Sequence, residues 1–156
     1  EGGCVKCITV PGGASGISRK QLDLYTAFAK SNGAKGLAWL SLGAEIRSSG
    51  IHQHLSAEEL DGLKAEAAAQ ESDLLLIMAD KAKQVSVVLG RLRLKLAEEL
   101  KLIDESKHCL LWLTDFPAFE FDENEGRLVA VNHPFTSPKL EDIALLESDP
   151  ESCKAR

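Results

Sequence analysis

The sequence predicts an α+β fold with a mainly antiparallel sheet and helices chiefly on one face. Helix-like and strand-like segments are mixed along the 156 residues, and two of the helical segments open with a capping box, a signal for a helix start. The last two strand-like segments are joined by a short turn, whereas parallel strands need a long crossover connection. We therefore favour an α+β fold over a doubly wound one.

The first predicted elements are a strand over residues 4–10 and a helix over residues 19–31. The strand segment is rich in β-branched residues and ends at a cluster of turn formers, which predicts a loop. Ser18 is a helix N-cap with Gln21 three residues later, and apolar residues follow at helical spacing. Gly33 ends the helix.

Two more strands and a second helix are predicted in the next part of the chain. Residues 37–42 form a short apolar run, which predicts a strand buried mainly on one face. Residues 51–55 alternate between apolar and polar, as in a short edge strand. Ser56 and Glu59 form the second capping box, so we expect a helix with Leu60 among its apolar positions.

A buried strand and a long helix are predicted to follow. Residues 74–78 are continuously apolar, and Asp80 is placed to cap the helix after them. The helix continues past Gly90 because its apolar positions keep helical spacing. These positions are Val85, Val88, Leu89, Leu92 and Leu96.

The last third predicts a β-hairpin and a final helix. Residues 108–121 are apolar and aromatic, residues 122–126 are turn formers, and residues 128–131 are strand-like. Ser137-Pro138 supplies a cap and a first-turn proline for a helix over residues 139–147.

Composition narrows the function classes. Eighteen Lys and Arg against 24 Asp and Glu give a net charge of −6, which argues against general attraction to nucleic acid or anionic membranes. No apolar run approaches the roughly 20 residues that a bilayer crossing needs. The four cysteines follow no secretory segment, so we expect a reducing cytoplasm. The chain begins at Glu1 and has one methionine, which indicates a processed chain or a piece of a longer one.

Three short motifs each allow two interpretations. Cys4-x-x-Cys7 resembles half of a zinc site or a redox pair, but residues i and i+3 of a strand face opposite ways, which favours two unrelated thiols. His52-x-His54 would place two imidazoles on one strand face, yet no clear third ligand accompanies them, so we favour surface histidines. The loop Gly12-Gly13-x-x-Gly16 could bind phosphate, but it matches no known phosphate motif, so we favour a plain turn.

The segment from Asp80 to Lys95 carries five basic residues and one acidic residue. Arg91 and Lys95 share a helical face. Such charge usually marks a solvated helix surface. It is also the place where a nucleic-acid backbone could bind, with Arg91, Arg93 and Lys95 as candidate contacts.

Six ordered blocks run across nearly the whole chain. The blocks are Val10-Pro11-Gly12-Gly13-Ala14 with Ser18-Arg19-Lys20, Gly33-Ala34-Lys35-Gly36-Leu37-Ala38-Trp39, Ala79-Asp80-Lys81, Leu89-Gly90-x-Leu92-Arg93-Leu94-Lys95-Leu96, Leu111-Trp112-x-x-Asp115-Phe116-Pro117-x-Phe119-Glu120 and His133-Pro134-Phe135-Thr136-Ser137-Pro138. Together these blocks resemble the bacterial-type aspartyl-tRNA synthetases, a class II family.

The resemblance implies two parts and a parent enzyme. Residues 1–107 would be the two-layer GAD-type insertion domain, and residues 108–156 a partial class II catalytic-domain segment that contains the hairpin. The parent would be a cytoplasmic homodimer that uses ATP and Mg²⁺ to activate L-aspartate and then transfers the aspartyl group to tRNA(Asp). It would need neither a membrane nor DNA.

The resemblance places no catalytic residue or metal ligand in this segment, so we expect the 156 residues alone to be inactive. The alternative is a tRNA-contacting insertion-type module of a tRNA-dependent amidotransferase, or a freestanding binding domain. The segment that begins at His133 argues against it, because that segment belongs to the synthetase side of the resemblance.

The candidate substrate contacts come from the same resemblance. The family has two consecutive histidines before Pro-Phe-Thr, and the first contacts substrate aspartate; here the pair is Asn132 and His133. An amide can hydrogen-bond a carboxylate or an ammonium group, but it cannot become cationic. Asp115 and Glu120 lie on a matching block without an assigned role. The sequence leaves open whether the parent also charges tRNA(Asn).

Overall fold

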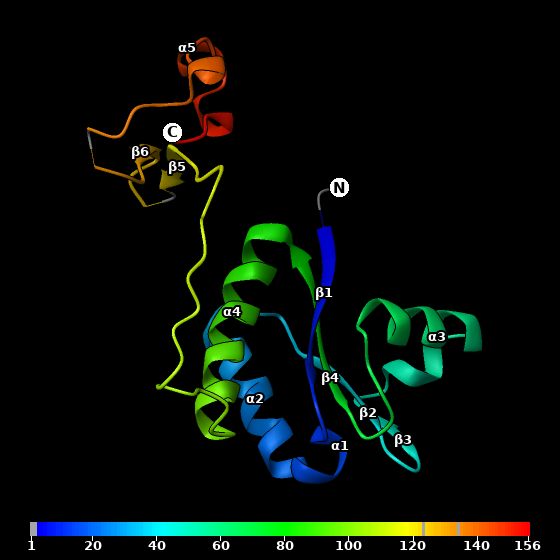
Figure 1. The fold of residues 1–156 in the computed structure, drawn as a ribbon. Helices are drawn as coiled ribbons and strands as arrows, with labels where there is room; N and C mark the ends of the chain where they lie inside the picture. Colours follow the sequence, from blue (N-terminus) through cyan, green and yellow to red (C-terminus); the bar gives the residue numbers. More distant parts are fainter. Residues whose placement is uncertain (1–2, 123, 134) are drawn as a thin grey trace. The chain divides into compact units, whose positions relative to one another are not determined.

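The structure is a computed structural model that describes residues 3–122, 124–133 and 135–156. It divides into two compact units, Glu1–Asp104 and Glu105–Arg156, and each is described by itself. The first unit holds a four-stranded sheet in the order β1-β4-β2-β3, and all its strand pairs are antiparallel (Figure 1). The strands are β1 (Gly3–Val10), β2 (Ala38–Leu42), β3 (Ile46–Ser48) and β4 (Leu74–Lys81). The predicted α+β class with an antiparallel sheet is confirmed.

The two longest helices cover one face of this sheet (Figure 1). They are α2 (Arg19–Ser31) and α4 (Ala82–Glu99). All five predicted apolar positions of α4 are buried in the core that the helices share with the sheet. Each fully buried Leu or Val contributes about 1.5–3 kcal/mol through removal of apolar surface from water. The helical spacing of apolar residues in the sequence therefore predicted which face of α4 is buried.

Helix α3 (Ala57–Glu66) covers the opposite face. Its Leu60 and Leu63 pack against a second apolar cluster that includes Leu40 of β2. Strand β2 is therefore buried on both faces, and the prediction that it would be buried mainly on one face is wrong. Successive side chains of a strand point to opposite faces of the sheet. Because helices cover both faces here, the side chains of β2 are buried on both sides.

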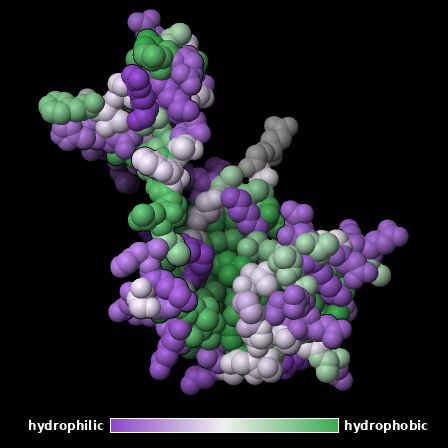
Figure 2. Space-filling model, viewed as in Figure 1, coloured by the Kyte–Doolittle hydropathy of each residue, from purple (hydrophilic) through white to green (hydrophobic). Residues whose placement is uncertain are grey.

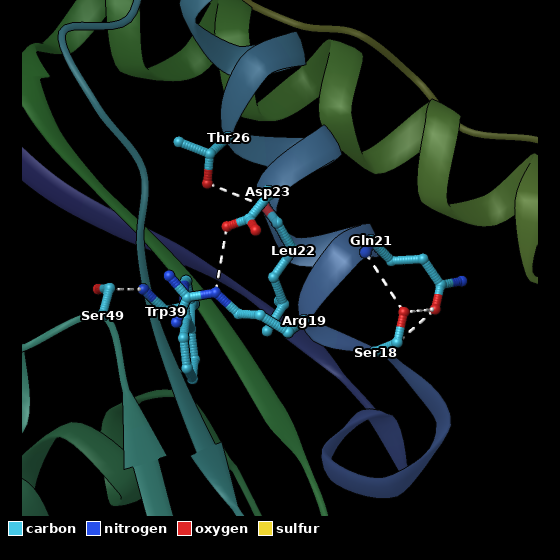
Figure 3. A network of polar contacts seen from close by, with 8 residues as sticks. All are labelled: Ser18, Arg19, Gln21, Leu22, Asp23, Thr26, Trp39 and Ser49. Atoms are coloured by element: carbon cyan, nitrogen blue, oxygen red, sulfur yellow. Dashed lines mark hydrogen bonds and ion pairs between the residues drawn. The ribbon is translucent and has the colours of Figure 1, made fainter.

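Both predicted capping boxes form. Ser18 Oγ accepts from Gln21 N at 3.3 Å, and Gln21 Oε1 accepts from Ser18 N at 2.9 Å (Figure 3). Ser56 and Glu59 repeat the arrangement at 3.2 and 2.8 Å. These bonds satisfy amide groups that a helix start leaves without partners, so the helix starts depend on local residues alone.

The predicted edge strand over residues 51–55 is wrong. Ile51–His54 form a 3-10 helix, and the edge strand is β3, earlier in the chain. Ser48 Oγ accepts from the backbone amides of Gly50 and His52 at 3.1 and 3.3 Å. Gly50 has a φ of 104°, which glycine adopts without strain. The hydrogen bonds from these amides to the Ser48 side chain hold a turn in place of the predicted strand, although apolar and polar residues alternate here in the sequence.

The predicted cap at Asp80 is also wrong. Strand β4 continues through this residue because it pairs with β1 as far as the Gly3–Lys81 partners. The helix N-cap is Lys81, without a side-chain cap bond, and Asp80 Oδ1 instead accepts from the Lys81 amide at 2.8 Å. A short helix, α1 (Gly13–Gly16), also stands where a loop was expected.

The second unit contains the predicted hairpin, but with shorter strands. Strands β5 (Phe119–Asp122) and β6 (Arg127–Ala130) pair antiparallel. Residues 108–118 have no regular strand, so the first predicted strand began too early. Strand β6 is four residues long and can pair with only an equal length of β5. Glu123 in the predicted turn lies outside the described residues.

The predicted helix over residues 139–147 is broken into short pieces. They are the 3-10 helix η2 (Leu140–Asp142) and α5 (Leu145–Ser148), and the 3-10 turn η3 (Pro150–Ser152) follows beyond the predicted end. Asp142 Oδ2 accepts from the Lys154 amide at 2.9 Å, which ties this region to the last residues of the chain. The tertiary bond holds a turn where local propensity favoured a continuous helix.

Candidate functional site

Asn132 and His133 follow β6 and line a cavity of about 120 Å³ in the second unit. Binding cavities for whole small ligands usually measure about 300–1,000 Å³, so this one can enclose only part of a ligand. The other lining residues are Ala118, Phe119, Ala130, Thr136 and Pro138. Pro134, in the same predicted motif, lies outside the described residues.

Asn132 is anchored through its side-chain amide. Its Nδ2 donates to the backbone carbonyl of Pro117 at 3.1 Å, while the neighbouring Val131 amide donates to the Ala118 carbonyl at 3.0 Å. An asparagine amide carries two N–H donors and one carbonyl acceptor. Asn132 can therefore offer a ligand its Oδ1 acceptor and a second N–H.

His133 is held by contacts within its own loop. Its Nδ1 accepts from the Phe135 amide at 3.3 Å, and the two rings meet edge to face with centroids 4.7 Å apart. The Thr136 amide donates to the His133 carbonyl at 2.8 Å. The Nδ1 atom is thus an acceptor, which leaves Nε2 as the ring position that can carry the proton.

The last residues of the chain hold both sides of this cavity. Residues 153–156 run antiparallel between residues 116–118 and residues 137–139. The backbone bonds are Ala118 N to Cys153 O at 2.9 Å, Ala155 N to Phe116 O at 2.7 Å, Lys139 N to Lys154 O at 2.9 Å and Arg156 N to Ser137 O at 3.0 Å. No local sequence pattern marks these residues as a strand, so this support could not be predicted from the sequence.

Asp115 forms an ion pair with Lys139. The ammonium group lowers the pKa of the Asp115 carboxyl, and the carboxylate raises the pKa of Lys139. Asp115 also has a φ of 57°, which non-glycine residues seldom adopt. Glu120 lies in β5 opposite Val129. The structure therefore gives Asp115 a structural partner that the sequence analysis did not predict.

The three candidate basic contacts on α4 do not lie together. Arg91 Nη1 donates to Asn32 Oδ1 at 2.7 Å, and Lys95 Nζ pairs with Glu99 Oε1 at 2.6 Å. Arg93 is exposed, and a helix turns about 200° between Arg91 and Arg93. Two of the candidate side chains thus have partners within the chain, and the third lies on another side of the helix.

The cysteine and histidine motifs lie as separate side chains. Cys4 packs against the core under α2 and α4, whereas Cys7 packs against the cluster under α3, as the strand geometry predicted. Burial raises the pKa of the Cys7 thiol. His52 and His54 lie on a 3-10 helix, so the prediction of a shared strand face is wrong.

No group of three or more His, Cys, Asp or Glu side chains in the described part of the chain could hold a metal ion. Magnesium prefers carboxylate, phosphate and water oxygens in near-octahedral geometry.

The glycine loop is occupied by a carboxylate of the chain itself. Gly12, with a φ of 66°, donates its amide to Asp73 Oδ1 at 2.9 Å. Asp73 is 7% exposed, and its Oδ2 accepts from the Gln70 amide at 2.9 Å. The Ala14 amide donates to a backbone carbonyl at 2.9 Å. These bonds argue against a phosphate loop, and residues 13–16 form the short helix α1 rather than the expected plain turn.

Known proteins are similar to this chain over its whole length. The GAD domain model matches residues 1–89. The chain is 47% identical over all its residues to the aspartate–tRNA ligase of Geobacillus kaustophilus, and 48% identical to the aspartate–tRNA(Asp/Asn) ligases of Halothermothrix orenii and Bacillus mycoides. It covers 26% of each relative, so the chain spans about a quarter of their length. Within the described residues, no helix is long and apolar enough to cross a membrane.

Proposed function

The chain belongs to the GAD domain family, and we propose that it is a segment of an aspartate–tRNA ligase that activates L-aspartate with ATP and transfers the aspartyl group to tRNA. The observation that carries this proposal is the extent of the similarity, which continues to the end of the chain, well past residue 89 where the GAD match ends. A GAD module of an amidotransferase would give no reason for that continuation.

The domain assignment is part of the same proposal. Residues 1–107 are the insertion domain, and residues 108–156 belong to the catalytic domain. The exposed apolar segment near the start of the second unit supports this, because Leu110 and Trp112 are 98% and 93% exposed. Figure 2 shows apolar side chains along this extended segment after α4. Exposed apolar runs of this kind usually contact another protein surface, here the rest of the longer enzyme.

An exchange assay tests the activity. The full-length protein that contains this sequence should exchange pyrophosphate with ATP, in the presence of Mg²⁺, when L-aspartate is added and not when L-asparagine is added. The 156-residue chain alone should give no exchange. No aspartate-dependent exchange by the full-length protein, or clear exchange by the isolated chain, would contradict the proposal.

Within this enzyme, Asn132 and His133 contact L-aspartate. The bond from Asn132 to the Pro117 carbonyl orients the side chain, so that Oδ1 can accept from the substrate ammonium group and the second N–H can donate to a carboxylate. The cavity that they line is small, which suits a site completed by other parts of the enzyme.

Substitution in the full-length enzyme tests this contact. Asn132→Ala should raise the KM for L-aspartate about tenfold, because hydrogen bonds to charged groups contribute about 1.5–3 kcal/mol. The KM for ATP should stay unchanged. Asn124→Ala, in the hairpin turn, is the matched control and should leave both constants unchanged. An unchanged aspartate KM for Asn132→Ala would remove this residue from the site.

The basic residues of α4 contact tRNA in the same proposal. Arg93 is the strongest candidate, because Arg91 and Lys95 are bound to Asn32 and Glu99. Arg93→Glu should weaken tRNA binding by the full-length enzyme at low salt and reduce its salt dependence. Lys101→Glu, just beyond the helix, is the control for net charge. Equal effects of the two substitutions would leave Arg93 without a specific role.

The oligomeric state and location follow the family. We propose a homodimeric, cytoplasmic parent enzyme whose partners are tRNA(Asp), L-aspartate and ATP. Light scattering on the full-length protein tests the dimer, and a monomeric mass at micromolar concentration would contradict it.

A further inference from the structure

A larger cavity, of about 320 Å³, lies in the first unit on the side of the sheet covered by α2 and α4. Three strands of the sheet line it, with Trp39 and Ser41 from β2, Arg47 and Ser48 from β3, and Leu74 from β4. The other lining residues come from α1, α2 and the residues between them, and they are Gly13, Ile17, Arg19 and Leu22. None of the lining residues is acidic.

Ser41 carries an unsatisfied hydroxyl in this cavity. The residue is 3% exposed, and its Oγ has no hydrogen-bond partner among the described residues. Most buried polar groups in proteins are hydrogen-bonded, and a buried hydroxyl without a partner destabilises the fold. Ser41 points to the same face as Leu74 and Arg47, which are its partners on the adjacent strands. A ligand that accepts a hydrogen bond here would satisfy it.

Arg19 stands over one wall of the cavity. Its guanidinium carbon lies 5.2 Å from the centroid of the Trp39 ring, and its Nε pairs with Asp23 at 3.1 Å (Figure 3). The Arg19 and Asp23 side chains are 68% and 63% exposed, so their ion pair contributes little. The bond to Asp23 uses one of the five guanidinium N–H groups, so the others remain as donors on a residue that lines the cavity.

Arg47 supplies a second guanidinium group from β3. It lies opposite Ser41 in the β2–β3 pairing, and its Nη2 donates to the Ala14 carbonyl at 3.0 Å. This bond positions the guanidinium group at the cavity and leaves further N–H donors. Two guanidinium groups and a buried hydroxyl thus surround one cavity.

We propose that this cavity binds the phosphate group of a phosphate monoester. Planar guanidinium groups bind phosphate oxygens through paired, charge-assisted hydrogen bonds, and the Ser41 hydroxyl can donate to another oxygen. The volume falls at the lower end of the range for small-molecule sites, so it holds a phosphate group together with part of the molecule that carries it. The carrier can be a free nucleotide or another small phosphate ester.

NMR titration of the 156-residue chain tests the proposal with three probes: adenosine 5′-monophosphate, inorganic phosphate and acetate. The Ser41 amide and the Trp39 indole should shift saturably with the two phosphate probes. Tighter binding of the nucleotide identifies a nucleotide site, and equal binding identifies a site for the phosphate group alone. Both outcomes support the phosphate site. No saturable shift with either phosphate probe, or equal affinity for acetate, would overturn it.

Three variants separate binding from folding. Ser41→Ala should lower the affinity about tenfold, as expected for loss of a hydrogen bond to an anion. It should not lower the urea midpoint, because the Ser41 hydroxyl has no hydrogen-bond partner among the residues that the structure describes. Arg19→Gln should also weaken binding. Lys20→Gln is its matched control, with the same charge change on the next residue of α2 but outside the cavity. Unchanged affinity for Ser41→Ala, or an equal loss for Lys20→Gln, would refute the site.

Discussion

Gly13→Ala should destabilise the first unit. A Cβ at Gly13 would lie 2.8 Å from Leu74 Cβ and 3.2 Å from Val10 Cβ and Cγ1, whereas carbon atoms pack best at about 3.5–4.0 Å. Leu74 and Val10 are 1% and 4% exposed and are partners in the β1–β4 pairing, so neither can move aside freely. Overpacking of this kind costs about 1–3 kcal/mol. The lower entropy of the unfolded alanine chain offsets about 0.4–1 kcal/mol.

Urea unfolding followed by far-ultraviolet circular dichroism measures this effect, because the long helices belong to the first unit. The midpoint for Gly13→Ala should fall by about 1 M for a net loss of about 1–2 kcal/mol. Gly16→Ala is the matched control in the same short helix, since a Cβ there meets nothing within 4 Å. Its midpoint should stay the same or rise. Equal midpoints for the two variants would refute the close approach at Gly13.

Three further measurements test other parts of the structure. Burial, together with a hydrogen bond to the Glu99 carboxylate, raises the pKa of Tyr25, the only tyrosine, to about 12. The Tyr25 absorbance of the folded protein should therefore titrate near pH 12. The stability that the raised pKa adds should be complete below about pH 10 and lost as the pH rises through the folded pKa. A titration midpoint near pH 10 in the folded protein would contradict the contact between Tyr25 and the carboxylate. Lys139 lowers the pKa of Asp115, so the stability from this pair should be present above about pH 3.9 and lost as the pH falls. In Lys139→Gln, the carboxyl titration seen by NMR should move up, and no movement would argue against the pair. Alkylation should modify exposed Cys109 before Cys153, which is buried and whose thiol pKa is raised; equal rates would show that Cys153 is accessible.

Local signals predicted most of the first unit. The two capping boxes and the apolar stripe of α4 depend on residues three or four apart, and such neighbours meet in any helix. The assignments at Asp80 and at residues 51–55 were wrong because distant or side-chain bonds decided them. Strand pairing with β1 kept Asp80 in a strand, and Ser48 bonded a turn where a strand was expected.

In the candidate sites, too, some features follow from local sequence and others depend on contacts between distant residues. Ordered motifs pointed to Asn132 and His133, but their support by residues 153–156 depends on strand pairing between segments far apart in the sequence. The Asp115–Lys139 ion pair spans 24 residues and has no sequence signal. The larger cavity takes its lining from residues between Gly13 and Leu74, and only packing of the sheet against α2 brings them together.

The sequence by itself determined the α+β class, the helices with strong caps and spacing, and the similarity to synthetases. Tertiary structure decided which faces of the sheet are covered, where β4 ends, and which polar groups meet. Helix periodicity and capping act over a few residues, so they can be recognised along the chain. Strand partners, ion pairs and cavities join residues that are distant in sequence, and their positions are set only when the core packs.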